Sequence, residues 1–207
     1  MTALPLVFAS VVHAQNADDD TLQIVAFGNS LMAGYQLPAT DGFVPKLQAA
    51  LDAKGYRAKI IAAGVSGDTT SGGLARLDWS VPEGTDAVLL ELGANDALRG
   101  VPLGKTRENL NAMISRLQER DIEVLLVGML APPNMGKDYG DEFKAIFADL
   151  SDQYDLPLYP FFLNGVMAVP GTQLGDGMHP NARGVEIMVA GILPQVEALI
   201  EKLRPTP

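Results

Sequence analysis

The chain of 207 residues contains no cysteine, which excludes disulfides, thiolate catalysis and cysteine-ligated zinc or iron–sulfur sites. Basic residues are scarce: 15 lysines and arginines stand against 25 aspartates and glutamates, so the formal net charge is −10. Such a surface repels nucleic acid and anionic membrane faces, and we expect neither as a partner. Aromatic residues make up only 6%, and the single tryptophan, Trp79, gives little indication of a platform for stacking sugars.

Long hydrophobic runs are also missing. The apolar run Leu4–Val12 is too short to span a bilayer, and no other segment is long and apolar enough to do so. Val12-His13-Ala14 then places small or β-branched residues around one arbitrary position, as at a signal-peptidase site. We therefore expect residues 1–14 to belong to an export signal cleaved after Ala14, and the mature protein to be periplasmic or secreted. The alternative is an ordinary apolar first strand.

What the sequence does contain is enough apolar material for a core. Hydrophobic residues make up 47% of the chain and charged residues 19%, a balance that argues against disorder. The length favours one domain of ordinary size, and no repeat or low-complexity linker divides it. We therefore expect a single domain over residues 15–207.

Short apolar strands alternate with amphipathic helices from residue 21 onward. Five strands are predicted, at Leu22–Phe27, Ala58–Ala63, Asp86–Leu92, Glu123–Leu130 and Leu156–Tyr159. Helices are predicted at Phe43–Lys54, from Asp68-Thr69-Thr70 onward, and at Thr106–Arg120, Asp141–Tyr154 and Ala182–Leu203. This order indicates an α/β fold, a parallel sheet with helices on both faces. In such a fold the loops at the carboxyl ends of the strands build the site.

A serine and a histidine occupy two of these loops. Ser30 follows the first strand, where a serine is most often a helix N-cap. A hydroxyl becomes a useful nucleophile only with a base within hydrogen-bond reach, and histidine is the usual base near neutral pH. His13 lies in the predicted signal, so His179 is the one imidazole left. Asp176, three residues before it, would hold the ring in one tautomer, although Asp-Gly and His-Pro also suit a plain surface turn.

Donors for a developing oxyanion follow the other strands. Gly64 can bring its backbone N–H close because it has no side chain, Asn95 offers an amide, and Ser30 offers its own N–H. Each residue also has a plain interpretation, as a turn glycine or as part of a turn or helix cap. Ser30 does not fit the α/β-hydrolase elbow G-x-S-x-G, since the residue two positions later is Met32.

Four ordered blocks resemble the SGNH hydrolases, also called GDSL esterases and lipases. The blocks are Gly28-Asn29-Ser30-Leu31, Gly64, Gly93-Ala94-Asn95-Asp96, and Asp176 with His179. FGNSLMAGYQLP, AAGVSGDTTSGGLARL and LELGANDALRG are most similar to the small exported branch of thioesterases, lysophospholipases and arylesterases. The resemblance implies a flavodoxin-like three-layer sandwich with five parallel strands. It implies Ser30 as nucleophile, His179 as base, Asp176 as its orienter, and Ser30, Gly64 and Asn95 as oxyanion donors.

One residue departs from the family pattern, which usually has Asp before the nucleophile. Here the residue is Asn29, which keeps the shape and one acceptor oxygen but loses the charge. Because Asn29 is not one of the implied catalytic positions, we expect activity to persist with an altered pH dependence.

The sequence therefore predicts a serine esterase acting through an acyl-enzyme on Ser30, with no metal and no organic cofactor. No long insertion forms a lid, so we expect short-acyl carboxylic esters, including aryl esters, as small-molecule substrates. Apolar side chains at Met129, Leu174 and Met178 are predicted to contact the acyl group, with ordinary loop packing as the alternative. Three other functions stay open: a thioesterase or lysophospholipase, a binding module without turnover, and a carbohydrate deacetylase.

Overall fold

The protein is described from a computed structural model, in which residues 21–204 are placed. The predicted signal, residues 1–14, lies outside the described residues. The strands of the sheet are β1 (Leu22–Gly28), β2 (Ala58–Gly64), β3 (Ala87–Glu91), β4 (Glu123–Val127) and β5 (Leu158–Tyr159). Their order is β2-β1-β3-β4-β5, and all neighbours are parallel. This is the flavodoxin-like order, so the predicted fold is confirmed.

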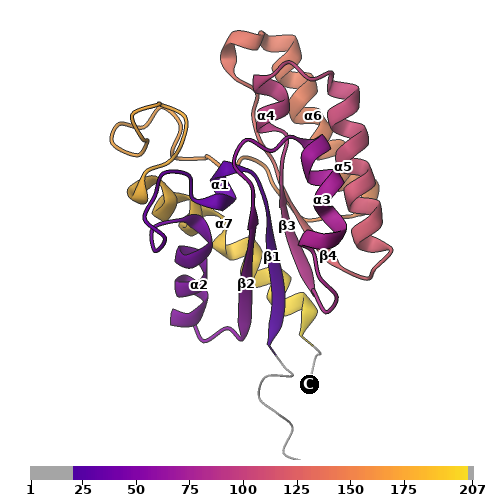
Figure 1. Cartoon of the computed structure of the whole chain (residues 1–207), viewed down its shortest axis with the longest axis vertical. Helices are drawn as coiled ribbons and strands as arrows, with labels where there is room; N and C mark the ends of the chain where they lie inside the picture. The colour runs from indigo at the N-terminus through magenta and orange to yellow at the C-terminus, as the bar shows by residue number, and fades with distance from the viewer. Residues whose placement is uncertain (1–20, 205–207) are drawn as a thin grey trace, which may run out of the picture.

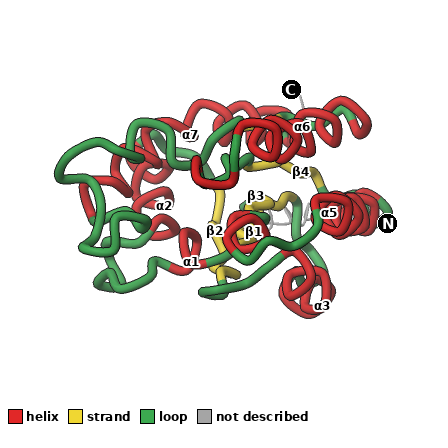
Figure 2. The backbone as a smooth tube through the Cα atoms, turned by 90° about the horizontal axis from the view of Figure 1, so that it is seen from above, coloured by secondary structure: helices red, strands yellow, loops and turns green. Residues whose placement is uncertain are grey.

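Helices cover both faces of the sheet (Figures 1 and 2). On one face α2 (Phe43–Ala53) packs against α7 (Ala182–Leu203). On the other α3 (Thr70–Ser80) packs against α5 (Leu103–Gln118), which also contacts α6 (Lys137–Tyr154). No helix within residues 21–204 combines the length and the apolar character needed to cross a membrane.

The predicted and observed elements differ mainly at their ends. The apolar run expected as strand up to Leu130 leaves the sheet at Val127, where pairing with the two-residue β5 stops. β5 pairs through Leu158 and Tyr159 only. Three short helices were not predicted, because each is shorter than two full turns and has no readable periodicity: α1 (Ser30–Ala33), α4 (Ala94–Leu98) and η1 (Pro133–Met135).

The centre of the sheet forms the core, and β1 lies inside it, between β2 and β3. The residues Ile24, Val25, Ala26 and Phe27 are all 0% exposed, as expected for a strand covered on both faces. Full burial of such side chains contributes roughly 1.5–3 kcal/mol for each large one. The register places Gly28 opposite both Gly64 and Glu91. Three strands therefore end at one level, and the segments that follow them meet at one edge of the sheet.

Candidate active site

Ser30 is the first residue of α1, two residues past the end of β1, and it is half-buried. The cap of this short helix is Asn29, whose Oδ1 accepts the Leu31 N–H at 3.0 Å. The capping role that is common for a serine in this position thus falls to its neighbour. The Ser30 hydroxyl is left facing the loop that precedes α7.

That loop, which lies beside α1 at the carboxyl edge in Figure 1, is a tight turn organised by Asp176. Its Oδ1 accepts the backbone N–H groups of Met178 (2.9 Å) and His179 (3.0 Å). Gly177, between Asp176 and Met178, has φ +67°, a left-handed conformation that favours glycine. The Asp-Gly signal for a turn was therefore correct, and the turn itself brings carboxylate and imidazole together.

Ser30, His179 and Asp176 form one chain of hydrogen bonds. The distance from His179 Nε2 to Ser30 Oγ is 2.8 Å, and from His179 Nδ1 to Asp176 Oδ2 it is 2.6 Å. If Nδ1 carries the ring proton, Nε2 is free to accept the hydroxyl proton. The Tyr35 ring lies over the imidazole, with centroids 4.5 Å apart. No pattern in the sequence singles out this tyrosine.

Asp176 is held in its ionised form. The N–H groups of His179 and Met178, followed by the His179 side chain, lower the pKa of Asp176 to about 2. Its side chain is 32% exposed, so solvent screens part of this effect. The carboxylate therefore remains charged across the pH range in which an imidazole can act as a base.

Asn95 lies on α4, just past β3, and its amide is already oriented. Nδ2 donates to the backbone carbonyl of Asp68 at 2.8 Å. Because an amide nitrogen carries two hydrogens, a second donor remains beyond this bond.

Gly64, predicted as an oxyanion donor, is the last residue of β2. Val65 N–H donates to Gly28 O (3.0 Å). The backbone N–H and C=O groups of the odd-numbered residues of β2 therefore point toward β1. The backbone N–H groups of the even-numbered residues point away from β1, to the open edge of the sheet, where Ile60 N–H donates to the Gln48 side chain (2.8 Å). The Gly64 N–H therefore points away from β1. Its role as an oxyanion donor stays a prediction, and this register argues against it.

Close packing of α1 on β2 explains why position 64 is a glycine. A Cβ there would lie 2.4 Å from the Ala33 nitrogen, so only glycine lets α1 pack this closely on β2. A second glycine, Gly67 in the loop after β2, was missed. It has φ +82° and lies on the short stretch between Val65, which bonds to β1, and Asp68, which bonds to Asn95. The signal was present in the sequence as Ser-Gly-Asp, three residues beyond Gly64.

Behind Ser30, a buried carboxyl meets Asn29. Glu91 at the end of β3 is 0% exposed, and it accepts both the backbone N–H (3.1 Å) and the side-chain amide (2.7 Å) of Asn29. An aspartate at position 29 could make the second of these bonds only with a shared proton. The Asn29 amide donates its own hydrogen to Glu91, so no proton has to be shared between two carboxyl groups. Burial raises the pKa of Glu91 to about 8, although the two bonds from Asn29 act in the opposite direction.

The stability of the protein should therefore fall as pH rises from about 4.5 to about 8. Because the pKa of Glu91 is higher in the folded than in the unfolded chain, its contribution is complete below about 4.5 and is lost through about 8. The loss should be on the order of a few kcal/mol. Urea unfolding from pH 5 to 9 should show this slope in the wild type and not in Glu91→Gln. The control Glu123→Gln, at a partly exposed carboxylate, should keep it. Equal slopes in all three proteins would contradict the assignment.

The three residues predicted to contact the acyl group lie in different surroundings. Met129 is 4% exposed and packs in the core just past β4. Leu174 is half-buried, and Met178 is 47% exposed beside His179. Their contact with a substrate stays a prediction, and Met178 has the most free surface for it.

The family comparison agrees with this geometry. Residues 26–187 match the model of the GDSL-like Lipase/Acylhydrolase family. The chain belongs to this family. Since the match covers most of the chain, it confirms the predicted family and the prediction of a carboxylic ester hydrolase.

Individual relatives extend the comparison. The chain is 40% identical over 159 residues to an arylesterase of Vibrio mimicus, covering 76% of this chain and 80% of the relative. It is 33% identical over 198 residues to thioesterase 1/protease 1/lysophospholipase L1 of Escherichia coli (strain K12), covering 95% and 93%. The crystal structure of TesA superposes with a TM-score of 0.82 at 34% identity, covering 86% of this chain and 99% of that one.

Proposed function

We propose that this GDSL hydrolase cleaves carboxylic esters through an acyl-enzyme on Ser30. The observation that carries the proposal is the 2.8 Å contact between the Ser30 hydroxyl and His179 Nε2, completed by Asp176. Ser30 attacks the ester carbonyl while His179 takes the hydroxyl proton. His179 then returns this proton to the leaving alcohol, and water repeats the sequence on the acyl-enzyme. Asp176 stabilises the imidazolium that forms in each step.

The oxyanion of each tetrahedral intermediate needs preorganised donors. We assign these to the N–H of Ser30, the second amide hydrogen of Asn95 and a backbone N–H of the loop after β2. For the last donor we favour Gly67 over Gly64, because Gly67 lies between the loop's contacts to β1 and to Asn95. A crystal structure of a phosphonate adduct on Ser30 would decide: the phosphoryl oxygen should lie within hydrogen-bond distance of the correct nitrogen.

Short acyl groups are the proposed substrates, including aryl esters. The similarity to an arylesterase favours an aromatic leaving group. The side chains of Met167, Val169 and Met178, on the segment between β5 and α7, are exposed and offer apolar surface to a substrate.

A chain-length series of nitrophenyl esters tests this preference. We expect kcat/KM to be highest for short acyl groups and to fall steadily beyond them, because an open surface buries little of a longer chain. Met178→Ser removes apolar surface beside His179, so kcat/KM should differ less from one short ester to the next. An optimum at long acyl chains would contradict the substrate class while leaving the catalytic mechanism intact.

A thioesterase or lysophospholipase activity is the second candidate, favoured by the similarity to the Escherichia coli enzyme. The same hydrogen-bond chain would act, with a thiolate as leaving group from a thioester, or the glycerol hydroxyl of a glycerophosphodiester as leaving group from a lysophospholipid. Initial rates on matched acetyl esters, acetyl thioesters and a lysophospholipid would separate the two candidates. Faster turnover of the thioester or the lysophospholipid would replace the first proposal with the second.

We also propose that residues 1–14 direct export and that residues 15–207 form the mature domain, in the periplasm or outside the cell. The apolar run and the small residues before Gln15 support this. N-terminal sequencing of the protein recovered from the periplasm should begin at Gln15. Recovery of the uncleaved chain from the cytoplasm would refute it.

A further inference from the structure

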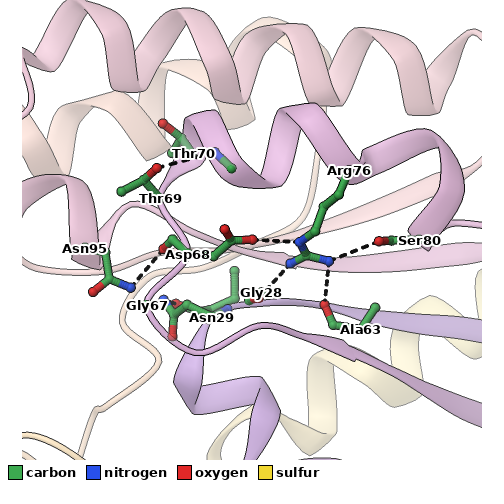
Figure 3. Close-up of polar contacts among 12 residues, drawn as sticks. Gly28, Asn29, Ala63, Gly67, Asp68, Thr69, Thr70, Arg76, Ser80 and Asn95 are labelled. Carbon is green, nitrogen blue, oxygen red and sulfur yellow. Dashed lines mark hydrogen bonds and ion pairs between the residues drawn. The ribbon is translucent and has the colours of Figure 1, made fainter.

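Arg76 is a buried cation on α3 that the catalytic proposal does not use. Its side chain is 8% exposed, and its guanidinium carbon lies 4.0 Å from the centroid of the Phe27 ring. Four hydrogen bonds leave the guanidinium group (Figure 3), to Asp68 Oδ2 (2.6 Å), Ala63 O (2.9 Å), Gly28 O (2.9 Å) and Ser80 Oγ (3.2 Å). Such a set of donors in a fixed plane is specific to arginine.

Two of these acceptors are the carbonyls at the ends of β1 and β2. The Gly28 carbonyl belongs to the peptide that leads into Asn29, and the N–H of the same peptide donates to Glu91 Oε2 at 3.1 Å. This peptide is thus held by a cation at its oxygen and by a carboxyl group at its nitrogen. Ser30 comes one residue later, so its backbone is located by the same two groups.

Asp68 extends the arrangement to the other side of the site. Its carboxylate holds Arg76 Nε, and its backbone carbonyl holds the Asn95 amide. Figure 3 shows the three side chains in sequence, with Gly67 next to Asp68. The pair of Arg76 and Asp68 therefore connects the segment with Ser30, the loop with Gly67 and the side chain of Asn95.

We propose that Arg76, together with Asp68, is a positioning residue that sets the geometry of the oxyanion donors. Arg76 touches no substrate; it fixes the three segments that carry the donors relative to one another. Donors of this kind work only when they are preorganised, and a displacement of about 1 Å costs up to about 10²-fold in rate. This inference rests on the proposed function, since it presupposes an oxyanion formed at Ser30.

A stabilising role alone predicts a different result. Removal of one partner of a buried ion pair destabilises a fold, yet the molecules that remain folded would then turn over at the normal rate. The test therefore measures kcat and KM separately, well below the melting temperature of each variant.

Arg76→Lys keeps the charge and one contact to Asp68, but it lacks the planar fork that reaches both carbonyls. We expect kcat for a short nitrophenyl ester to fall by about 10- to 100-fold, with KM changed by less than about threefold. The rate of phosphonylation of Ser30 by an organophosphonate should fall in parallel, because that reaction uses the same donors.

Arg120→Lys is the matched control. Arg120 also donates to two backbone carbonyls, those of Val81 (2.7 Å) and Pro82 (3.2 Å), but at the opposite end of the sheet, before β3. Its kcat should equal that of the wild type. If Arg76→Lys does not fold, Asp68→Asn provides the same test with a smaller expected fall, since it keeps the carbonyl that holds Asn95.

The outcomes separate the two proposals. Wild-type kcat in folded Arg76→Lys, or equal losses in Arg76→Lys and Arg120→Lys, would overturn the positioning role. If the positioning role fails in this way while Ser30→Ala is inactive in the same assay, the proposed function still stands. If Ser30→Ala is fully active, the proposed function fails, and the positioning role fails with it.

Discussion

Replacement of Ser30 by alanine should lower kcat by roughly 10⁴-fold or more on any ester that the wild type hydrolyses. The variant has no atom to form the acyl-enzyme, and His179 Nε2 loses the partner at 2.8 Å. The fold should not change, because Asn29 caps α1 and the Ser30 side chain has no role in the core. The measurement is kcat on a short nitrophenyl ester, with the melting temperature recorded alongside.

The control for this variant is Ser115→Ala. Ser115 lies on the exposed face of α5, where its hydroxyl bonds Glu119 at 3.0 Å. It should keep full activity. Activity of Ser30→Ala within about tenfold of the wild type, in protein free of any wild-type contamination, would exclude Ser30 as the nucleophile.

His179→Gln should lose roughly 10³-fold or more of kcat. Glutamine can still hydrogen-bond the Ser30 hydroxyl, but it cannot accept its proton and carry it to the leaving alcohol. The residual rate should rise with hydroxide concentration instead of following the titration of an imidazole. Profiles of kcat against pH for the wild type and the variant measure both effects.

Ser115→Ala again serves as the control, since the Ser115 hydroxyl bonds Glu119 on α5 and no residue of the site. It should behave as the wild type. A His179→Gln variant that keeps more than about a tenth of the activity, or an unchanged pH profile, would show that another group moves the proton.

Much of the fold was predictable because it follows from local patterns. The apolar runs gave the strands, and their alternation with amphipathic segments gave the parallel sheet. The strand ends then pointed to Ser30 and Asn95, since parallel strands share a carboxyl edge. His179 followed by elimination, as the one histidine outside the predicted signal.

Other features depend on geometry that no local pattern carries. Successive residues of a strand point their backbone N–H groups in opposite directions. Whether the Gly64 N–H faces β1 or the open edge therefore depends on the exact register of β2, and a shift of one residue would reverse its direction. The raised pKa of Glu91 depends on burial beneath Asn29, and in the sequence Glu91 is one more acidic residue of a strand. Likewise, nothing in the sequence shows that the Arg76 side chain reaches the ends of both β1 and β2.

Trapping the acyl-enzyme is the most direct test of the account. The wild type and Ser30→Ala are mixed with excess nitrophenyl acetate, quenched in acid within the first turnovers, digested and analysed by peptide mass spectrometry. We predict one acetyl group, on Ser30, in the wild type and none on the corresponding peptide of the variant. An acetyl group on a different residue, or steady turnover with no acetylated peptide at all, would contradict it.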